Sequence, residues 1–118
     1  MTNEDLEKYL RDLGGNIENV RGSDGQPYIV IRDYVIPAGV LQGRTCDVAI
    51  LRSSSVPYVP QSAIHTRPAL VPMDMNKYRT QPSGVGPEWQ YWSRVLRGVP
   101  TPQSIVAHIA TVFSEVQL

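Results

Sequence analysis

The sequence is poor in the residues that support several common kinds of chemistry. It has one cysteine in 118 residues, so no disulfide can form within the chain. Its two histidines belong to no HxxxH or CxxC pattern, which argues against a metal site. No Walker-type or GxGxxG loop is present, so no nucleotide site is indicated. We therefore expect neither a metal nor another cofactor.

Net charge and long apolar runs are also lacking. Eleven basic and eleven acidic residues cancel, which removes the electrostatic basis for non-specific binding to nucleic acid or to a membrane surface. No window approaches the roughly 18 consecutive apolar residues of a membrane span, and the acidic start of the chain is unlike a signal peptide. These features predict a cytoplasmic protein that binds neither nucleic acid nor a membrane.

Apolar residues at helical spacing predict a helix near each end of the chain. Thr2 or Asn3 can cap the first helix, and Gly14-Gly15 would end it. Thr101 can cap the second, predicted over residues 101–117, and Pro102 suits its first position. The apolar faces of the two helices would contain Leu6, Tyr9, Leu10 and Leu13, and Ile105, Val106, Ile109, Ala110, Val112, Phe113 and Val116.

Strand patterns fill the first half of the chain between the helices. We expect four strands, the first around Ile17 and the others over residues 27–36, 45–51 and 62–66. Residues 67–86 have no clear period, and an ordered loop of that length suggests a function. The sequence predicts one α+β domain over residues 1–118, with the helices on one face of a four-stranded antiparallel meander.

Four short motifs follow this order of elements. Pro57-Tyr58-Val59-Pro60 is similar to a Tyr-Pro-x-x-Pro-Pro turn, and Arg67-Pro68-Ala69 stands where a His-Pro-Asn motif is expected. Residues 89–94 read Trp-Gln-x-Trp-Ser-Arg, and Thr101-Pro102 begins the last helix. With these motifs the chain resembles ubiquitin-conjugating enzymes, and in particular a bacterial branch with that tryptophan signature. The resemblance implies a minimal form of the fold that lacks its last helices.

The resemblance also implies a function and partners. Members of the bacterial branch are typically encoded beside a ubiquitin-like protein, an activating enzyme and a JAB-type metallopeptidase. We expect this chain to accept the ubiquitin-like protein from the activating enzyme. Conjugating enzymes bind the activating enzyme through their first helix. The exposed side of that helix would contain Glu4, Glu7, Lys8 and Arg11.

The flap segment, residues 86–94, departs from the family pattern because it contains no cysteine. Ser93 lies nine residues before Pro102, close to the position of the family's nucleophile, and could carry an acyl group as an oxyester. His65 and Arg94 are the candidate helpers. The alternatives are that Ser93 only bonds a backbone group in a turn and that His65 only satisfies a backbone carbonyl.

The two tryptophans of the flap, Trp89 and Trp92, would either brace it and exclude water or plug one end of the core. Cys46 shares a predicted strand face with Val48 and Ile50, so we expect a buried, inert thiol.

Five basic residues flank the long loop and the flap, where they would meet an acidic partner or form an ordinary solvated rim. They are Arg67, Lys77, Arg79, Arg94 and Arg97. A non-catalytic adaptor on the same fold, which binds a ubiquitin-like protein or an activating enzyme, remains the alternative function.

Overall fold

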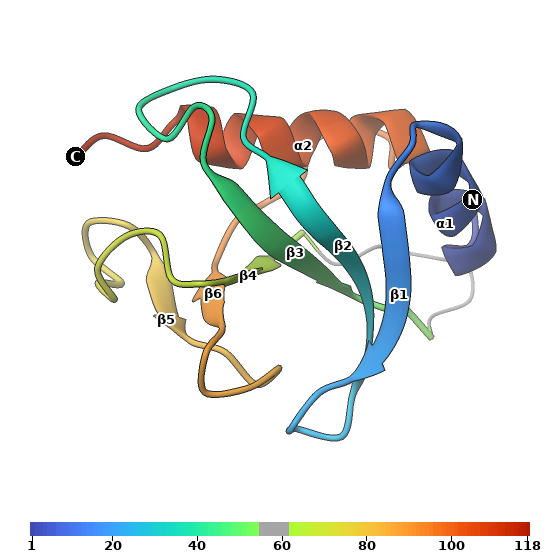
Figure 1. The fold of residues 1–118 in the computed structure, drawn as a ribbon, viewed down its shortest axis with the longest axis horizontal. Coiled ribbons are helices and arrows are strands. Elements are labelled where there is room, and N and C mark those ends of the chain that lie inside the picture. Colours follow the sequence, from blue (N-terminus) through green and yellow to red (C-terminus); the bar gives the residue numbers. More distant parts are fainter. Residues whose placement is uncertain (55–61) are drawn as a thin grey trace.

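The computed structural model describes residues 1–54 and 62–118, so the Pro57-Tyr58-Val59-Pro60 motif lies outside the described residues. Two helices, α1 (Asn3–Asp12) and α2 (Pro102–Ser114), accompany a six-stranded sheet (Figure 1). The strands are β1 (Asn16–Arg21), β2 (Pro27–Val35), β3 (Thr45–Leu51), β4 (Ile64–Arg67), β5 (Thr80–Pro82) and β6 (Gln90–Trp92). The fold class α+β is confirmed.

The sheet has six strands where four were predicted. All neighbouring strands are antiparallel, in the order β1-β2-β3-β4-β6-β5, so β6 lies between β4 and β5 and the sheet is not a simple meander. The two additional strands have only three residues each, which is too short to show an alternating pattern. Pro82 is tolerated in β5 because this strand is at an edge of the sheet.

Both helices begin at the predicted caps. The Thr2 side chain accepts a hydrogen bond from the Asp5 N–H, and the Asp5 carboxylate accepts one from the Thr2 N–H, which forms a capping box. Thr101 and Ser104 form the same arrangement at the start of α2. Helix α1 is followed by Gly14, whose φ of 89° suits glycine. Helix α2 ends at Ser114, earlier than predicted.

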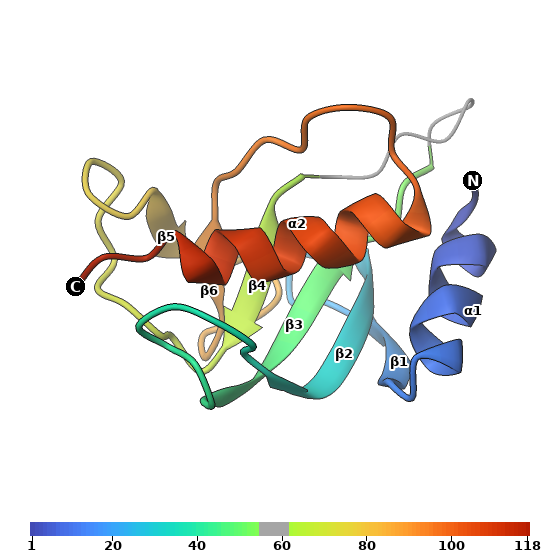
Figure 2. The ribbon, with the colours of Figure 1, turned by 90° about the horizontal axis from the view of Figure 1, so that it is seen from above.

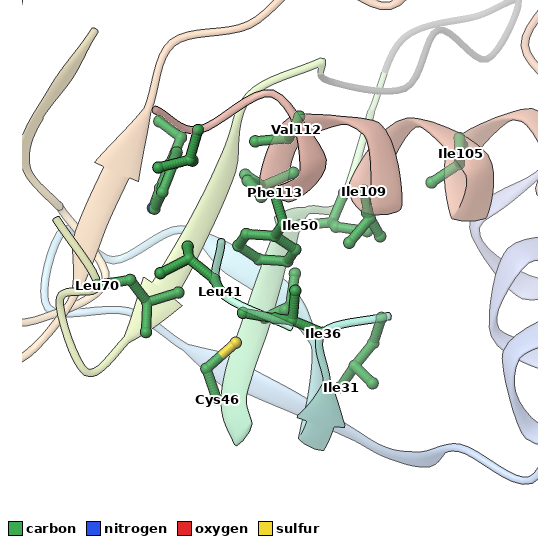
Figure 3. Packing of buried hydrophobic residues seen from close by; sticks show 14 of the residues in the cluster. Ile31, Ile36, Leu41, Cys46, Ile50, Leu70, Ile105, Ile109, Val112 and Phe113 are labelled. Carbon is green, nitrogen blue, oxygen red and sulfur yellow. The ribbon is translucent and has the colours of Figure 1, made fainter. Parts of the chain in front are cut away.

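The main core lies between α2 and one face of the sheet. Figure 2 shows α2 crossing this face, with α1 beside the start of α2. Figure 3 shows side chains of the helix packed on those of the strands and on Leu41 and Leu70. The helix contributes Ile105, Ile109, Val112 and Phe113. Cys46, Val48 and Ile50 belong to this core, as the predicted strand face required.

A second, smaller core covers part of the opposite face of the sheet. Alternation along β2 sends Ile29 and Ile31 toward α2, and Tyr28 and Val30 away from it. The segment of residues 83–89 covers Tyr28 and Val30 with Val85 and Trp89. The cluster consists of Tyr28, Val30, Ala49, Val85 and Trp89. Residues 83–89 therefore cover the face of the sheet that the helices do not occupy.

Candidate functional site

The two tryptophans of the flap are buried in different cores. Trp89 packs in the cluster away from α2, with the Arg67 guanidinium 4.9 Å from its ring centroid. Trp92 is fully buried on the α2 side, where it meets Phe113 edge-to-face at 5.7 Å and donates from Nε1 to Thr66 Oγ1 at 3.0 Å. The pair does not plug one end of a single core. It anchors the flap from both faces of the sheet.

Gln90, between the tryptophans, is also engaged in the scaffold. It is fully buried, its Oε1 accepts from the Leu70 N–H at 2.9 Å, and its Nε2 donates to the Val71 carbonyl at 2.7 Å. The side chain thus satisfies backbone groups of the loop after β4, as a neighbouring strand would. Gln90 was not predicted from the sequence, because a buried glutamine cannot be recognised without its hydrogen-bond partners.

His65 is buried beneath the flap and is held by neighbours other than Ser93. Its Nδ1 is hydrogen-bonded to Ser83 Oγ at 2.7 Å, and its ring meets Tyr28 and Tyr91 edge-to-face at 5.2 and 5.3 Å. Burial lowers the pKa of its imidazole to about 4, although the charge of Asp24 opposes the shift. His65 is therefore neutral at pH 7 and ties β4 to β6 and to the segment that begins at Ser83. The sequence left open that His65 satisfies a backbone carbonyl, but the partner of its Nδ1 in the structure is the Ser83 hydroxyl.

Ser93 directly follows β6 and is half-buried. Its N–H donates to the Arg79 carbonyl at 2.8 Å, and its own carbonyl accepts from Arg94 Nη1 at 2.8 Å. Arg79 has a φ of 54°, an uncommon conformation for a residue with a side chain. The N–H and the carbonyl of Ser93 are thus both bonded to arginines, the first to the backbone of Arg79 and the second to the side chain of Arg94.

The chain after Ser93 forms one side of a cleft of about 640 Å³. Residues 94–97 line it together with α2 and Arg79. Burial, and then the charge of Arg79, lower the pKa of Arg94, whose guanidinium lies over the Trp92 ring at 5.4 Å. His108, on α2, also lines the cleft; it is half-buried and donates from Nε2 to the Ser62 carbonyl at 2.7 Å. It ties α2 to the approach of β4.

Cys46 is 3% exposed, as predicted. Burial raises the pKa of its thiol to about 12, with a smaller contribution from Asp47. A thiol with this pKa is almost entirely protonated at pH 7, and the thiolate is the reactive form. Cys46 is therefore a structural residue of the core.

The outer side of α1 is only partly as expected. Lys8 has a side chain 79% exposed and pairs with Asp12 at 2.8 Å, while Glu4 and Arg11 are also exposed. Glu7 was predicted to be exposed, which is wrong, since it is 8% exposed. It forms an ion pair with Arg52, at the end of β3, because the carboxylate faces the sheet rather than solvent. Glu7 thus joins α1 to the sheet.

Two kinds of site are not seen in the part of the chain that the structure describes. Across residues 1–54 and 62–118, no group of three or more histidine, cysteine, aspartate or glutamate side chains is arranged to hold a metal ion. Neither helix of these residues is long and apolar enough to cross a membrane. The hydrogen bonds of Ser93 described above are made by its backbone, to the Arg79 carbonyl and from Arg94 Nη1.

One of the comparisons with known proteins gives a match. Comparisons with curated proteins and with solved structures give no significant match. A model of the family described as prokaryotic E2 family E matches residues 2–118, nearly the whole chain. E2 proteins are ubiquitin-conjugating enzymes, and the α+β fold is compatible with this family. This chain therefore belongs to prokaryotic E2 family E.

Proposed function

We propose that this protein accepts a ubiquitin-like protein from an activating enzyme and carries it as an oxyester on Ser93. The observation that supports this assignment is that the first part of the motif is buried in the scaffold, whereas its last two residues are not. Trp89, Gln90 and Trp92 are buried and bonded within the scaffold, which leaves the last two residues of the motif for chemistry. Ser93 is half-buried, with its backbone held on both sides.

The proposed step is an acyl transfer. Ser93 Oγ attacks the terminal carbonyl of the activated ubiquitin-like protein, so that an O–C bond forms and the bond to the activating enzyme breaks. The proton of the hydroxyl passes to the departing group. In a second step an amine of the target attacks the ester, the new C–N bond replaces the O–C bond, and Ser93 regains a proton.

Arg94 and His65 have different parts in this proposal. The guanidinium of Arg94 adjoins Ser93, so its charge can stabilise the oxyanion that develops during attack. His65 is hydrogen-bonded to Ser83, and we assign it a positioning role because its ring supports Tyr91 of β6, two residues before Ser93. Trp89 and Trp92 hold the flap in place from both faces of the sheet.

The experiment combines the protein with its activating enzyme, ATP and the ubiquitin-like protein, followed by a denaturing gel. We expect an adduct that resists thiols and is cleaved by mild base. Ser93→Ala should abolish it, and Ser93→Cys should give a thiol-sensitive adduct. Ser114→Ala, in an exposed serine at the end of α2, is the matched control. An adduct that survives in Ser93→Ala and is lost in Ser83→Ala would move the nucleophile to the serine that contacts His65.

A non-catalytic adaptor is the second candidate function. The observation in its favour is that His65, the candidate base, is held by Ser83 and has a pKa of about 4, which makes it a weak base. An adaptor would bind the ubiquitin-like protein or the activating enzyme and form no adduct. Stable association in a gel-filtration experiment, without a covalent product in the assay above, would favour this function.

A further inference from the structure

One cleft of the molecule is lined by positive charges that the protein does not neutralise. The cleft of about 640 Å³ lies between α2 and residues 94–97. These residues belong to the segment that leads from β6 back to the start of α2 (Figure 2). Arg79, Arg94 and Arg97 line it, and none of them forms an ion pair with another described residue. Four other arginines do form ion pairs, namely Arg11, Arg32, Arg52 and Arg67.

Arg94 shows that this charge is partly removed from water. Its Nη1 donates to the carbonyls of Ser93 and Arg79, at 2.8 and 3.4 Å. Its Nε is buried and has no hydrogen-bond partner within the described part of the chain. A buried charged donor without an acceptor is unfavourable, and an anion held beside the guanidinium would offset part of that cost through its charge.

The remaining side chains of the cleft suit an extended, negatively charged ligand. Thr111 contributes an exposed position on α2, and the guanidinium of an arginine matches a carboxylate in geometry. Glu115 is the acidic residue that lines the cleft, and its charge opposes the lowering of the Arg94 pKa. Three arginines against one glutamate leave the cleft positive, although the whole chain is neutral.

We propose that this cleft binds an acidic segment of a protein partner, with the carboxylates of that segment beside Arg79, Arg94 and Arg97. A protein is favoured over a small anion because three arginines contribute to one cleft of about 640 Å³, and because the proposed function is carried out with protein partners. This inference depends on the proposed function in one respect only, that the partner is a protein. It does not require an ester on Ser93.

The test measures binding of a fluorescein-labelled glutamate-rich peptide by fluorescence anisotropy, with the glutamine version of the peptide and inorganic phosphate as comparisons. We expect Arg79→Gln and Arg97→Gln each to weaken binding about two- to fivefold, as partly exposed charge pairs do. Glu115→Gln should strengthen it, because a competing carboxylate is removed. Arg44→Gln, in an exposed arginine outside the cleft, is the matched control and should leave binding unchanged.

The same titration, followed through the arginine Nε–H signals in NMR spectra, should shift the signal of Arg94. Equal binding of the glutamine peptide, or equal effects of the Arg97 and Arg44 substitutions, would overturn the proposal. Phosphate that binds while the peptide does not would make the cleft a small-anion site and would also overturn it. Peptide binding that persists in Ser93→Ala supports the proposal, and it separates this inference from a failure of the ester assignment.

Discussion

Acid should destabilise this protein through His65. The imidazole is 7% exposed, lies against Tyr28 and Tyr91, and has its pKa lowered to about 4 by burial, against about 6.5 in an unfolded chain. Because the folded pKa is the lower one, the unfolded chain binds the proton first as the pH falls. Folding stability is therefore lost from about pH 6.5 downward, and this loss ends near pH 4.

The size of the effect follows from the two pKa values. Each unit of difference is worth about 1.4 kcal/mol, so the complete loss is about 3 kcal/mol. Between pH 7 and pH 5 the expected loss is about 2 kcal/mol, since the unfolded histidine is by then almost fully protonated and the folded one is still neutral. This is a substantial part of the 5–15 kcal/mol by which domains are typically stable.

Urea denaturation at pH 7, 6 and 5 measures this loss directly. His65→Gln removes the titrating group, so its free energy of unfolding should vary much less with pH, even if the variant is less stable throughout. His108→Gln, in a half-buried histidine on α2, is the matched control and should retain the dependence. A His65→Gln variant with the slope of the unmodified protein, or an NMR titration that places the His65 pKa above 6, would refute the reasoning.

Three further outcomes follow from burial and exposure. Ile109→Ala should cost about 2–5 kcal/mol in urea denaturation, whereas Gln103→Ala on the exposed side of α2 should change little, and a loss below about half a kcal/mol would contradict the packing. Cys46 should react slowly with Ellman's reagent in the folded protein and fully after unfolding, and fast native labelling would show an accessible thiol. Lys8→Glu should weaken association with the activating enzyme at an unchanged melting temperature, since exposed pairs such as Lys8–Asp12 add little stability. Unchanged association would place that interface elsewhere.

Local sequence patterns were sufficient to predict the two helices and the longer strands, because these elements have enough residues to show a cap or an alternation. Thr2 and Thr101 cap the two helices because a cap depends on residues three apart in the chain. The alternation in β3 correctly assigned Cys46 to the core, because a strand of seven residues has room for the pattern. The resemblance to bacterial ubiquitin-conjugating enzymes is confirmed at the level of the family by the match over residues 2–118.

The position of the tryptophans shows where such patterns need the sheet to interpret them. Residues three apart in an extended chain point to opposite faces, so the spacing of Trp89 and Trp92 contained the signal for two separate cores. That signal could be used only if the segment was recognised as a strand. With three residues, β6 shows too little alternation for this, and its neighbours in the sheet are distant in sequence.

The contacts of Ser83, of Glu7 and of the arginines of the cleft depend on the tertiary structure. His65 is eighteen residues from Ser83 and pairs with it because β4 and β5, which Ser83 directly follows, lie in one sheet. Glu7 is drawn inward by Arg52, forty-five residues away. Arg79 meets Arg94 only because β5 and β6 are neighbours. Composition and periodicity determined the helices, the long strands and a neutral chain; which charges are paired and which remain free depended on contacts that close long loops, and local sequence does not encode these.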